Sequence, residues 1–220
     1  APDHRMDIGS GLTGIADLIE EIARVHGYDA IPQTIMNDAM PPQWENEHLG
    51  REERVRDLLV ALGLRENISY RFVTPEREAQ LIPPGVEVET NGDTYVRMKN
   101  PISSDRTVLR HSLLTNLLET AAGNTRYQTR QQVFEIGSVF FRKAAGELPE
   151  EPRRLALLIT GARGALGWQG GDNEAVDFYD LKGVVEGLLA GLHVDHVSYS
   201  RGNNPTFHPG RSALLTVNGD

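Results

Sequence analysis

The 220-residue chain contains no cysteine, which excludes disulfides, thiolate metal sites and cysteine nucleophiles. It also lacks any apolar run near the roughly 18 residues that a membrane-spanning helix needs. No basic segment followed by an apolar one is present, so we expect no signal peptide. These absences predict a cytoplasmic protein without membrane association.

Positive charge is scarce as well, since 22 lysines and arginines stand against 31 aspartates and glutamates, a formal net charge of −9. Nucleic-acid backbones are bound by clustered basic residues, so this balance argues against a main nucleic-acid surface. A modest basic concentration lies at Arg126, Arg130, Arg142 and Lys143, and we interpret it as a solvated face.

Motifs for nucleotide binding and simple catalytic sites are missing. Neither a P-loop nor a G-x-G-x-x-G fingerprint occurs, and the Gly-rich stretch Gly161–Gly171 is expected to be a mobile loop. His208 has no second histidine or carboxylate at ligand spacing, so we interpret it as a turn residue. Asp177 and Asp180 fit capping of the following helix better than acid–base chemistry.

What the chain does have is a patterned central segment, Met98–Phe141. Apolar residues at helical spacing predict one amphipathic helix that ends near Gly123 and Asn124. The aromatic and β-branched stretch Val133–Phe141 predicts a strand. Plain core packing would also explain this pattern. The helical stripe consists of Leu109, Leu113, Leu114, Leu117, Leu118 and Ala121.

Residues 1–40 are predicted to form a small first unit. It should hold a short strand at His4–Ile8, a flexible Gly-rich turn and one helix, Asp17–His26. Asp17 and Glu20 have the spacing of a capping box at the start of that helix.

Residues 41–220 are predicted to form a second, larger domain of mixed helices and strands. The stretch Arg154–Gly161 is nearly all apolar, so we expect a strand buried on both faces. Asn91–Gly92 predicts a type I′ hairpin turn. Further helices are predicted at Leu49–Leu62, Pro75–Leu81 and Asp177–Leu192, a hairpin around that turn at Val86–Met98, and strands at Glu66–Val73, Val194–Ser200 and Arg211–Val217.

Three short motifs follow one another in the central segment: NPIS at 100–103, LRHSLL at 109–114 and FEIGSVF at 134–140. Their order resembles the beta subunit of bacterial phenylalanyl-tRNA synthetases. Residues 16–32 and 177–189 agree with that family too, so the resemblance spans nearly the whole chain.

The resemblance implies an α+β fold of the class II aminoacyl-tRNA synthetase type, with an antiparallel sheet flanked by helices. Residues 1–40 would be the end of a small helix-turn-helix-like domain, and 41–220 a catalytic-like core domain truncated at its C-terminus. Helix Leu49–Leu62 and the strand after it resemble the class II signature that builds the subunit interface. Packing of this helix on its own sheet would explain the same apolar positions.

The resemblance also implies a module without an active site. Class II enzymes hold ATP with an arginine and a glutamate, and the arginine expected two residues before Glu135 is replaced by Val133. Arg110 resembles an arginine of the alpha subunit, but one arginine does not make a site. We therefore predict no catalytic and no cofactor-binding residue here, and ATP use by the alpha subunit.

A magnesium site is implied by the family at Asp7, Asp17, Glu20 and Glu21. Hard cations prefer oxygen ligands, and the last three residues share one helix face by spacing. Extra residues between Asp7 and Asp17 depart from the family pattern. Helix capping and the positive helix end would explain the same acidic residues.

As a function, the resemblance implies a scaffold part of phenylalanine–tRNA ligase, in an assembly of two alpha and two beta chains. Contacts with tRNA would lie mostly outside this chain. One alternative is a stand-alone synthetase-derived binding or regulatory module without aminoacylation. Another is an active ligase that binds ATP despite Val133. An apolar helix face without its partner would favour a homodimer.

Overall fold

The chain divides into two compact units, Ala1–Trp44 and Glu45–Asp220. Most of the hairpin predicted at Val86–Met98, including its turn, lies outside the described residues. The assignment of residues 1–40 to a helix-turn-helix-like domain stays a prediction. The computed structural model describes residues 3–35, 37–42, 45–82, 94–144, 146–165, 167–168 and 170–219.

The smaller unit contains helix α1 (Gly11–His26) and the short 3-10 helix η1 (Tyr28–Ala30). The predicted strand at His4–Ile8 is wrong, because these residues form turns. The predicted flexible turn is also wrong, since α1 begins at Gly11. The backbone of Gly9 packs directly against Gly14 in the first turn of the helix. A Cβ on Gly14 would lie 2.2 Å from the carbonyl oxygen of Gly9, so this packing requires glycine at position 14.

The predicted capping box of α1 is wrong as well. Ser10 is the residue before the helix, and Asp17 lies in the helix interior. The Asp17 carboxylate instead accepts a 2.7 Å hydrogen bond from the backbone N–H of Gly9. Gly27, with φ of 100°, follows the helix as predicted, because glycine tolerates that conformation.

The larger unit is built on a three-stranded sheet in the order β1-β4-β5. Strand β4 (Gln131–Ser138) is antiparallel to β5 (Arg153–Thr160), whereas β1 (Arg65–Glu66) is parallel to β4. The sheet is therefore mixed rather than antiparallel throughout.

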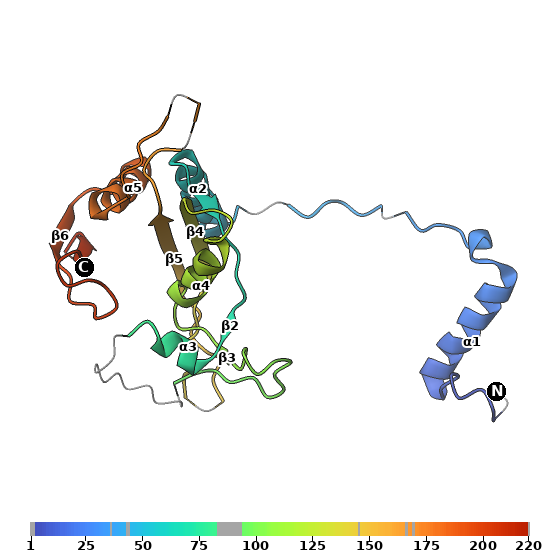
Figure 1. Ribbon diagram of the computed structural model, residues 1–220. Coiled ribbons are helices and arrows are strands. Elements are labelled where there is room, and N and C mark those ends of the chain that lie inside the picture. The colour runs from blue at the N-terminus through green and yellow to red at the C-terminus, as the bar shows by residue number, and fades with distance from the viewer. Residues whose placement is uncertain are drawn as a thin grey trace. The chain divides into compact units, whose positions relative to one another are not determined.

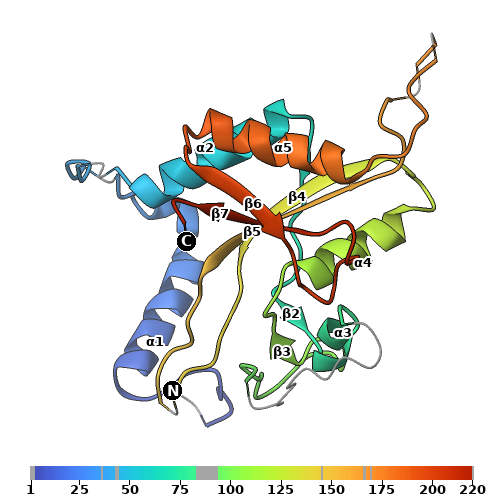
Figure 2. The same cartoon turned by 90° about the vertical axis from the view of Figure 1, so that its left-hand side faces the viewer.

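Helices cover both faces of this sheet (Figures 1 and 2). Helices α2 (Glu47–Ala61) and α5 (Phe178–Gly191) lie side by side on one face, and α4 (Leu114–Asn124) lies on the other. Both faces carry apolar cores. The α2/α5 core contains Leu59, Leu64, Phe134 and Leu188, and the α4 core contains Leu113, Leu117, Val139 and Ala156.

Local capping chemistry sets several helix starts, as predicted. Thr74 accepts a hydrogen bond from Arg77 N, and Pro75 opens α3 (Pro75–Ala79). Asp177 and Asp180 form a capping box at α5, which confirms their structural interpretation. The predicted boundaries of α2 and α5 are correct to within two residues.

Two elements around residue 109 differ from prediction. Leu109 is not helical, because Val108–Leu109 form β3, which pairs antiparallel with β2 (Phe72–Val73). The single strand predicted at Glu66–Val73 is split between β1 and β2, which belong to different sheets. Pairing between distant segments decided both outcomes.

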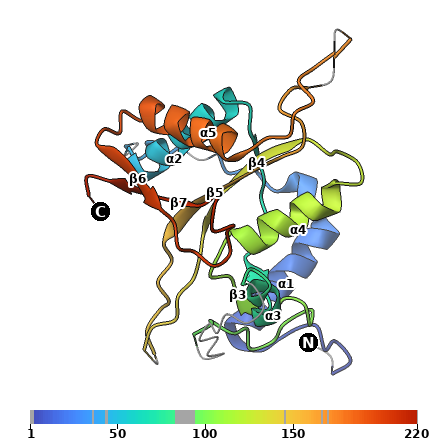
Figure 3. The same cartoon turned by 60° about the vertical axis from the view of Figure 1, so that its left-hand side comes forward.

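Strand β5 is not buried on both faces, since Ala156 alone among its residues is buried. β5 is an edge strand among the described residues, which explains this exposure. A separate antiparallel pair follows α5 in the chain and consists of β6 (Val197–Arg201) and β7 (Ala213–Val217) (Figures 2 and 3). No helix in the described part of the chain is long and apolar enough to cross a membrane.

Candidate functional site

The segment between β3 and α4, Arg110–Ser112, lies between two buried glutamates, and we call it the β3–α4 corner. Glu135 comes from β4 and binds the side chain of Arg110. Glu78 comes from α3 and accepts hydrogen bonds from the backbone N–H groups of His111 and Ser112. The LRHSLL and FEIG motifs therefore meet at one place in the fold.

Arg110 and Glu135 form a buried ion pair, with 2.5 Å between Nη1 and Oε1 and side chains only 2% and 3% exposed. Arg110 Nε also donates to the carbonyl of Ser138 at 3.1 Å. Glu135 accepts further hydrogen bonds from Ser69 Oγ at 2.7 Å and Asn67 Nδ2 at 3.3 Å. Burial of two charges is tolerated when both are paired and their remaining polar atoms are hydrogen-bonded.

Gly137 provides the space for this pair. Glu135 and Gly137 are alternate residues of β4 and so share the face toward α4. A Cβ on Gly137 would lie 2.3 Å from Arg110 Nη2, so any larger residue would displace the guanidinium. Ser112 Oγ accepts from the backbone N–H of Leu114 at 3.1 Å, where α4 begins.

Glu78 is held by donors of a different kind. It is 7% exposed and accepts from Tyr95 Oη at 2.8 Å, His111 N at 2.8 Å and Ser112 N at 3.1 Å. The rings of Tyr95 and His111 stack with centroids 3.9 Å apart. Burial of the phenol, followed by the charge of Glu78, raises the pKa of Tyr95.

The two buried glutamates position the backbone of the β3–α4 corner and do not contact a substrate. A general acid, base or nucleophile must contact a substrate, and Glu135 is buried with Arg110, Ser69 and Asn67 as partners. A substrate would have to break the ion pair to reach it. The two glutamates instead fix where the chain turns from β3 into α4.

The four predicted metal ligands lie in the smaller unit, and the structure does not gather them around a common point. Asp7 forms an ion pair with Arg5, with 2.7 Å between Nη2 and Oδ2, and this hydrogen bond lowers the pKa of Asp7 to about 2. The same Arg5 nitrogen lies 3.2 Å from Glu21, so a guanidinium occupies the space between these carboxylates. Asp17 is bonded to Gly9 N.

Glu20 is exposed on α1, one turn from Asp17 as its spacing predicts. The described ranges contain no group of three or more histidine, aspartate or glutamate side chains that could hold a metal ion. In this arrangement the Arg5 guanidinium, rather than a metal ion, bridges Asp7 and Glu21. The magnesium site stays a prediction.

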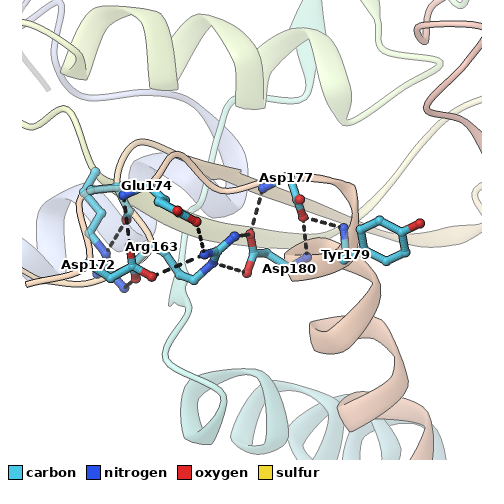
Figure 4. Close-up of polar contacts among 8 residues, drawn as sticks. Arg163, Asp172, Glu174, Asp177, Tyr179 and Asp180 are labelled. Atoms are coloured by element: carbon cyan, nitrogen blue, oxygen red, sulfur yellow. Dashed lines mark hydrogen bonds and ion pairs between the residues drawn. The ribbon is translucent and has the colours of Figure 1, made fainter.

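Arg163 was not singled out from the sequence, yet it joins three carboxylates (Figure 4). Its Nε lies 2.9 Å from Asp180, and its Nη1 lies 3.2 Å from Asp172 and 3.0 Å from Glu174. The Arg163 hydrogen bond lowers the pKa of Asp180. The base of the Gly161–Gly171 loop is therefore held on α5, and the available signal was an arginine followed closely by acidic residues.

Comparison with known proteins identifies what the sequence is similar to. The family described as "Phenylalanyl tRNA synthetase beta chain CLM domain" matches residues 31–220. Phenylalanine–tRNA ligase beta subunits from Syntrophus aciditrophicus and Bacillus subtilis are 39% and 36% identical, over 98% and 99% of this chain. The chain covers 26% of each relative, about a quarter of its length.

A solved structure of similar fold is PylSc from Desulfitobacterium hafniense, described as a pyrrolysyl tRNA synthetase. The TM-score is 0.52 at 12% sequence identity, over 87% of this chain and 57% of that one. At this identity the likeness concerns the fold alone. It confirms the predicted α+β fold of the class II synthetase type.

Proposed function

The chain belongs to the phenylalanyl-tRNA synthetase beta chain family, and from this premise we propose that it is a non-catalytic scaffold within phenylalanine–tRNA ligase. In this proposal the alpha subunit binds ATP and phenylalanine and charges tRNA. Two alpha and two beta chains assemble in the cytoplasm, and this chain supports the alpha subunit.

The bonding of Glu135 carries the proposal. Stabilising the charge that develops in adenylyl transfer requires positive groups that face the substrate. Here Val133 stands where the class II arginine is expected, and the Arg110 guanidinium is turned inward onto Glu135. The face of β4 that would hold ATP is thus filled by the chain's own ion pair.

The outward face of α2 is the surface we assign to the alpha subunit. Most apolar residues of α2 pack inward against α5 and the sheet. Leu49 and Val60 stay 53% and 55% exposed, and Glu53 and Asp57 are exposed between them at helical spacing. This stripe suits a partner helix with apolar ends and basic residues between them.

Co-expression with the alpha subunit of the same source tests the proposal, with mass read by light scattering. We expect a stoichiometric complex that Val60→Asp disrupts. Leu214→Asp is the matched control, because Leu214 is 56% exposed on β7, and it should leave the complex intact. A folded wild-type chain that forms no complex at micromolar concentration would contradict the proposal and favour a stand-alone module.

A further inference from the structure

A polar cavity of about 260 Å³ lies between β1, the start of β4 and the end of α4 with the loop after it. Its charged lining residues are Arg65, Arg130 and Glu66. The amide side chains in its lining are Asn67, Asn124, Gln128, Gln131 and Gln132.

The register of β1 places the two charged residues that β1 contributes to the cavity lining on opposite faces of the sheet. Arg65 pairs with Val133 and Glu66 with Phe134, and paired residues lie on the same face of a sheet. Arg65 therefore lies on the α4 face, beside Val133. Glu66 lies on the opposite face, where Arg56 of α2 neutralises it at 2.9 Å. The Arg65 guanidinium forms no hydrogen bond or ion pair with the residues that the structure describes.

Arg130 supplies a second guanidinium that is fixed in place. Its Nε donates to the carbonyl of Ala162 at 3.1 Å and its Nη2 to that of Arg163 at 3.4 Å. No carboxylate among the described residues pairs with it. Two arginines that pair with no carboxylate among the described residues thus line one cavity, in a chain whose net charge is −9. The one carboxylate in its lining, Glu66, is already paired with Arg56.

The loop after α4 continues the positively charged surface beyond the cavity. The stretch 120–134 contains no acidic residue. Tyr127 is 78% exposed, and the Arg126 guanidinium lies 4.7 Å from the centroid of its ring. An exposed aromatic ring next to arginines is a surface on which a nucleobase stacks.

We propose that this cavity binds one phosphate group. Guanidinium groups bind phosphate through paired charge-assisted hydrogen bonds, and the amide side chains add donors. The cavity is smaller than the about 300–1,000 Å³ of pockets that enclose whole ligands, so it accommodates a single anionic group. The exposed Tyr127 favours single-stranded RNA as the source of that group over free phosphate. This proposal goes beyond the scaffold function and does not depend on the alpha subunit.

The test is titration of the isolated 220-residue chain with inorganic phosphate, and separately with a fluorescent single-stranded RNA of about ten nucleotides. Arginine side-chain NMR resonances report phosphate binding, and fluorescence anisotropy reports RNA binding. Phosphate should shift the Nε–H resonances of Arg65 and Arg130. Arg65→Gln should weaken binding of either probe about tenfold, the loss expected for one charge-assisted contact.

Arg201→Gln is the matched control, since Arg201 is an exposed strand arginine of β6 without an ion pair among the described residues. It should change binding by less than about twofold. Tyr127→Ala should weaken RNA binding and leave phosphate binding unchanged, and phosphate should compete with RNA. Phosphate binding without RNA binding would support the site with the free anion as its source. Equal effects of Arg65→Gln and Arg201→Gln, with both variants folded, would overturn the proposal.

Discussion

Glu135 and Glu78 are both buried beside the β3–α4 corner, yet the molecule stabilises them in different ways. Glu135, 2% exposed, faces a guanidinium. Glu78, 7% exposed, accepts hydrogen bonds from a phenol and two backbone N–H groups, and among the described residues the one basic nitrogen within 4.0 Å of its carboxylate is His111 Nδ1. The first arrangement balances charge with charge, and the second disperses it over neutral donors.

This difference has a functional meaning. Under the scaffold proposal, the Glu135 carboxylate has no substrate to contact. The charge of Glu135 is neutralised by the ion pair with Arg110, and the absence of a side chain at Gly137 leaves space for the guanidinium. The fold is kept while the polar residues of the β4 face serve its stability.

Of the substitutions that test this difference, removal of Arg110 should lower the free energy of unfolding the most. Arg110→Met leaves Glu135 buried without a counter-charge and should lower the free energy of unfolding by about 3–5 kcal/mol. Urea denaturation measures this. The double variant Arg110→Met with Glu135→Leu should recover more than half of the loss, because no buried charge remains. A double variant as unstable as the single one would show that the pair does not act as an ionic unit.

The second glutamate should depend less on a single partner. Tyr95→Phe removes one of three donors to Glu78 and should cost about 1.5–3 kcal/mol, the range for hydrogen bonds to charged groups. Tyr199→Phe, on an exposed strand residue, serves as control and should stay within about 0.5 kcal/mol of the parent. Equal losses of stability in the two variants would show that the Tyr95 hydroxyl does not stabilise Glu78.

The space at Gly137 provides a smaller test. Gly137→Ala should cost about 1–3 kcal/mol by overpacking against the Arg110 guanidinium. Gly123→Ala is the matched control, because Gly123 is helical with nothing within 4 Å of an added Cβ. It should stabilise the chain by about 0.5–1 kcal/mol through helix propensity. Thermal melts measure both effects: the melting temperature should fall in Gly137→Ala and rise in Gly123→Ala.

High pH should weaken the Glu78 arrangement alone. Burial raises the pKa of Tyr95 above its ordinary value of about 10. Above that pH the unfolded chain loses a proton that the folded chain keeps, so the stability from Tyr95 is present below about pH 10 and falls as pH rises. Unfolding curves from about pH 8 to pH 11 should show this slope, and Tyr95→Phe should reduce it. An unchanged slope in that variant would contradict the assignment.

Sequence reasoning succeeded where structure depends on neighbouring residues. Thr74 at α3 and the Asp177–Asp180 box at α5 were predicted because capping is local. Leu109 was misplaced because its apolar side chain fits a helical stripe as well as a strand, and pairing with Phe72 decided the outcome. The start of α1 was missed because it depends on close backbone contact, which spacing does not reveal.

The candidate site was only half predictable. Arg110 and Glu135 were each singled out, but they are 25 residues apart, and their pairing depends on how β3 leads into α4. Glu78 carried no motif at all, because its partners are backbone N–H groups and a phenol from elsewhere in the chain. Arg65 became visible through the register of β1 with β4.

The most direct test of the account is aminoacylation by the assembled alpha and beta subunits, with Arg110→Met and Glu135→Leu together in the full-length beta chain. If the pair is structural, the assembly should form, and both kcat and KM for phenylalanine should stay within about twofold of the parent. An intact assembly that loses activity about a hundredfold or more would show that Glu135 takes part in the chemistry, against the scaffold proposal.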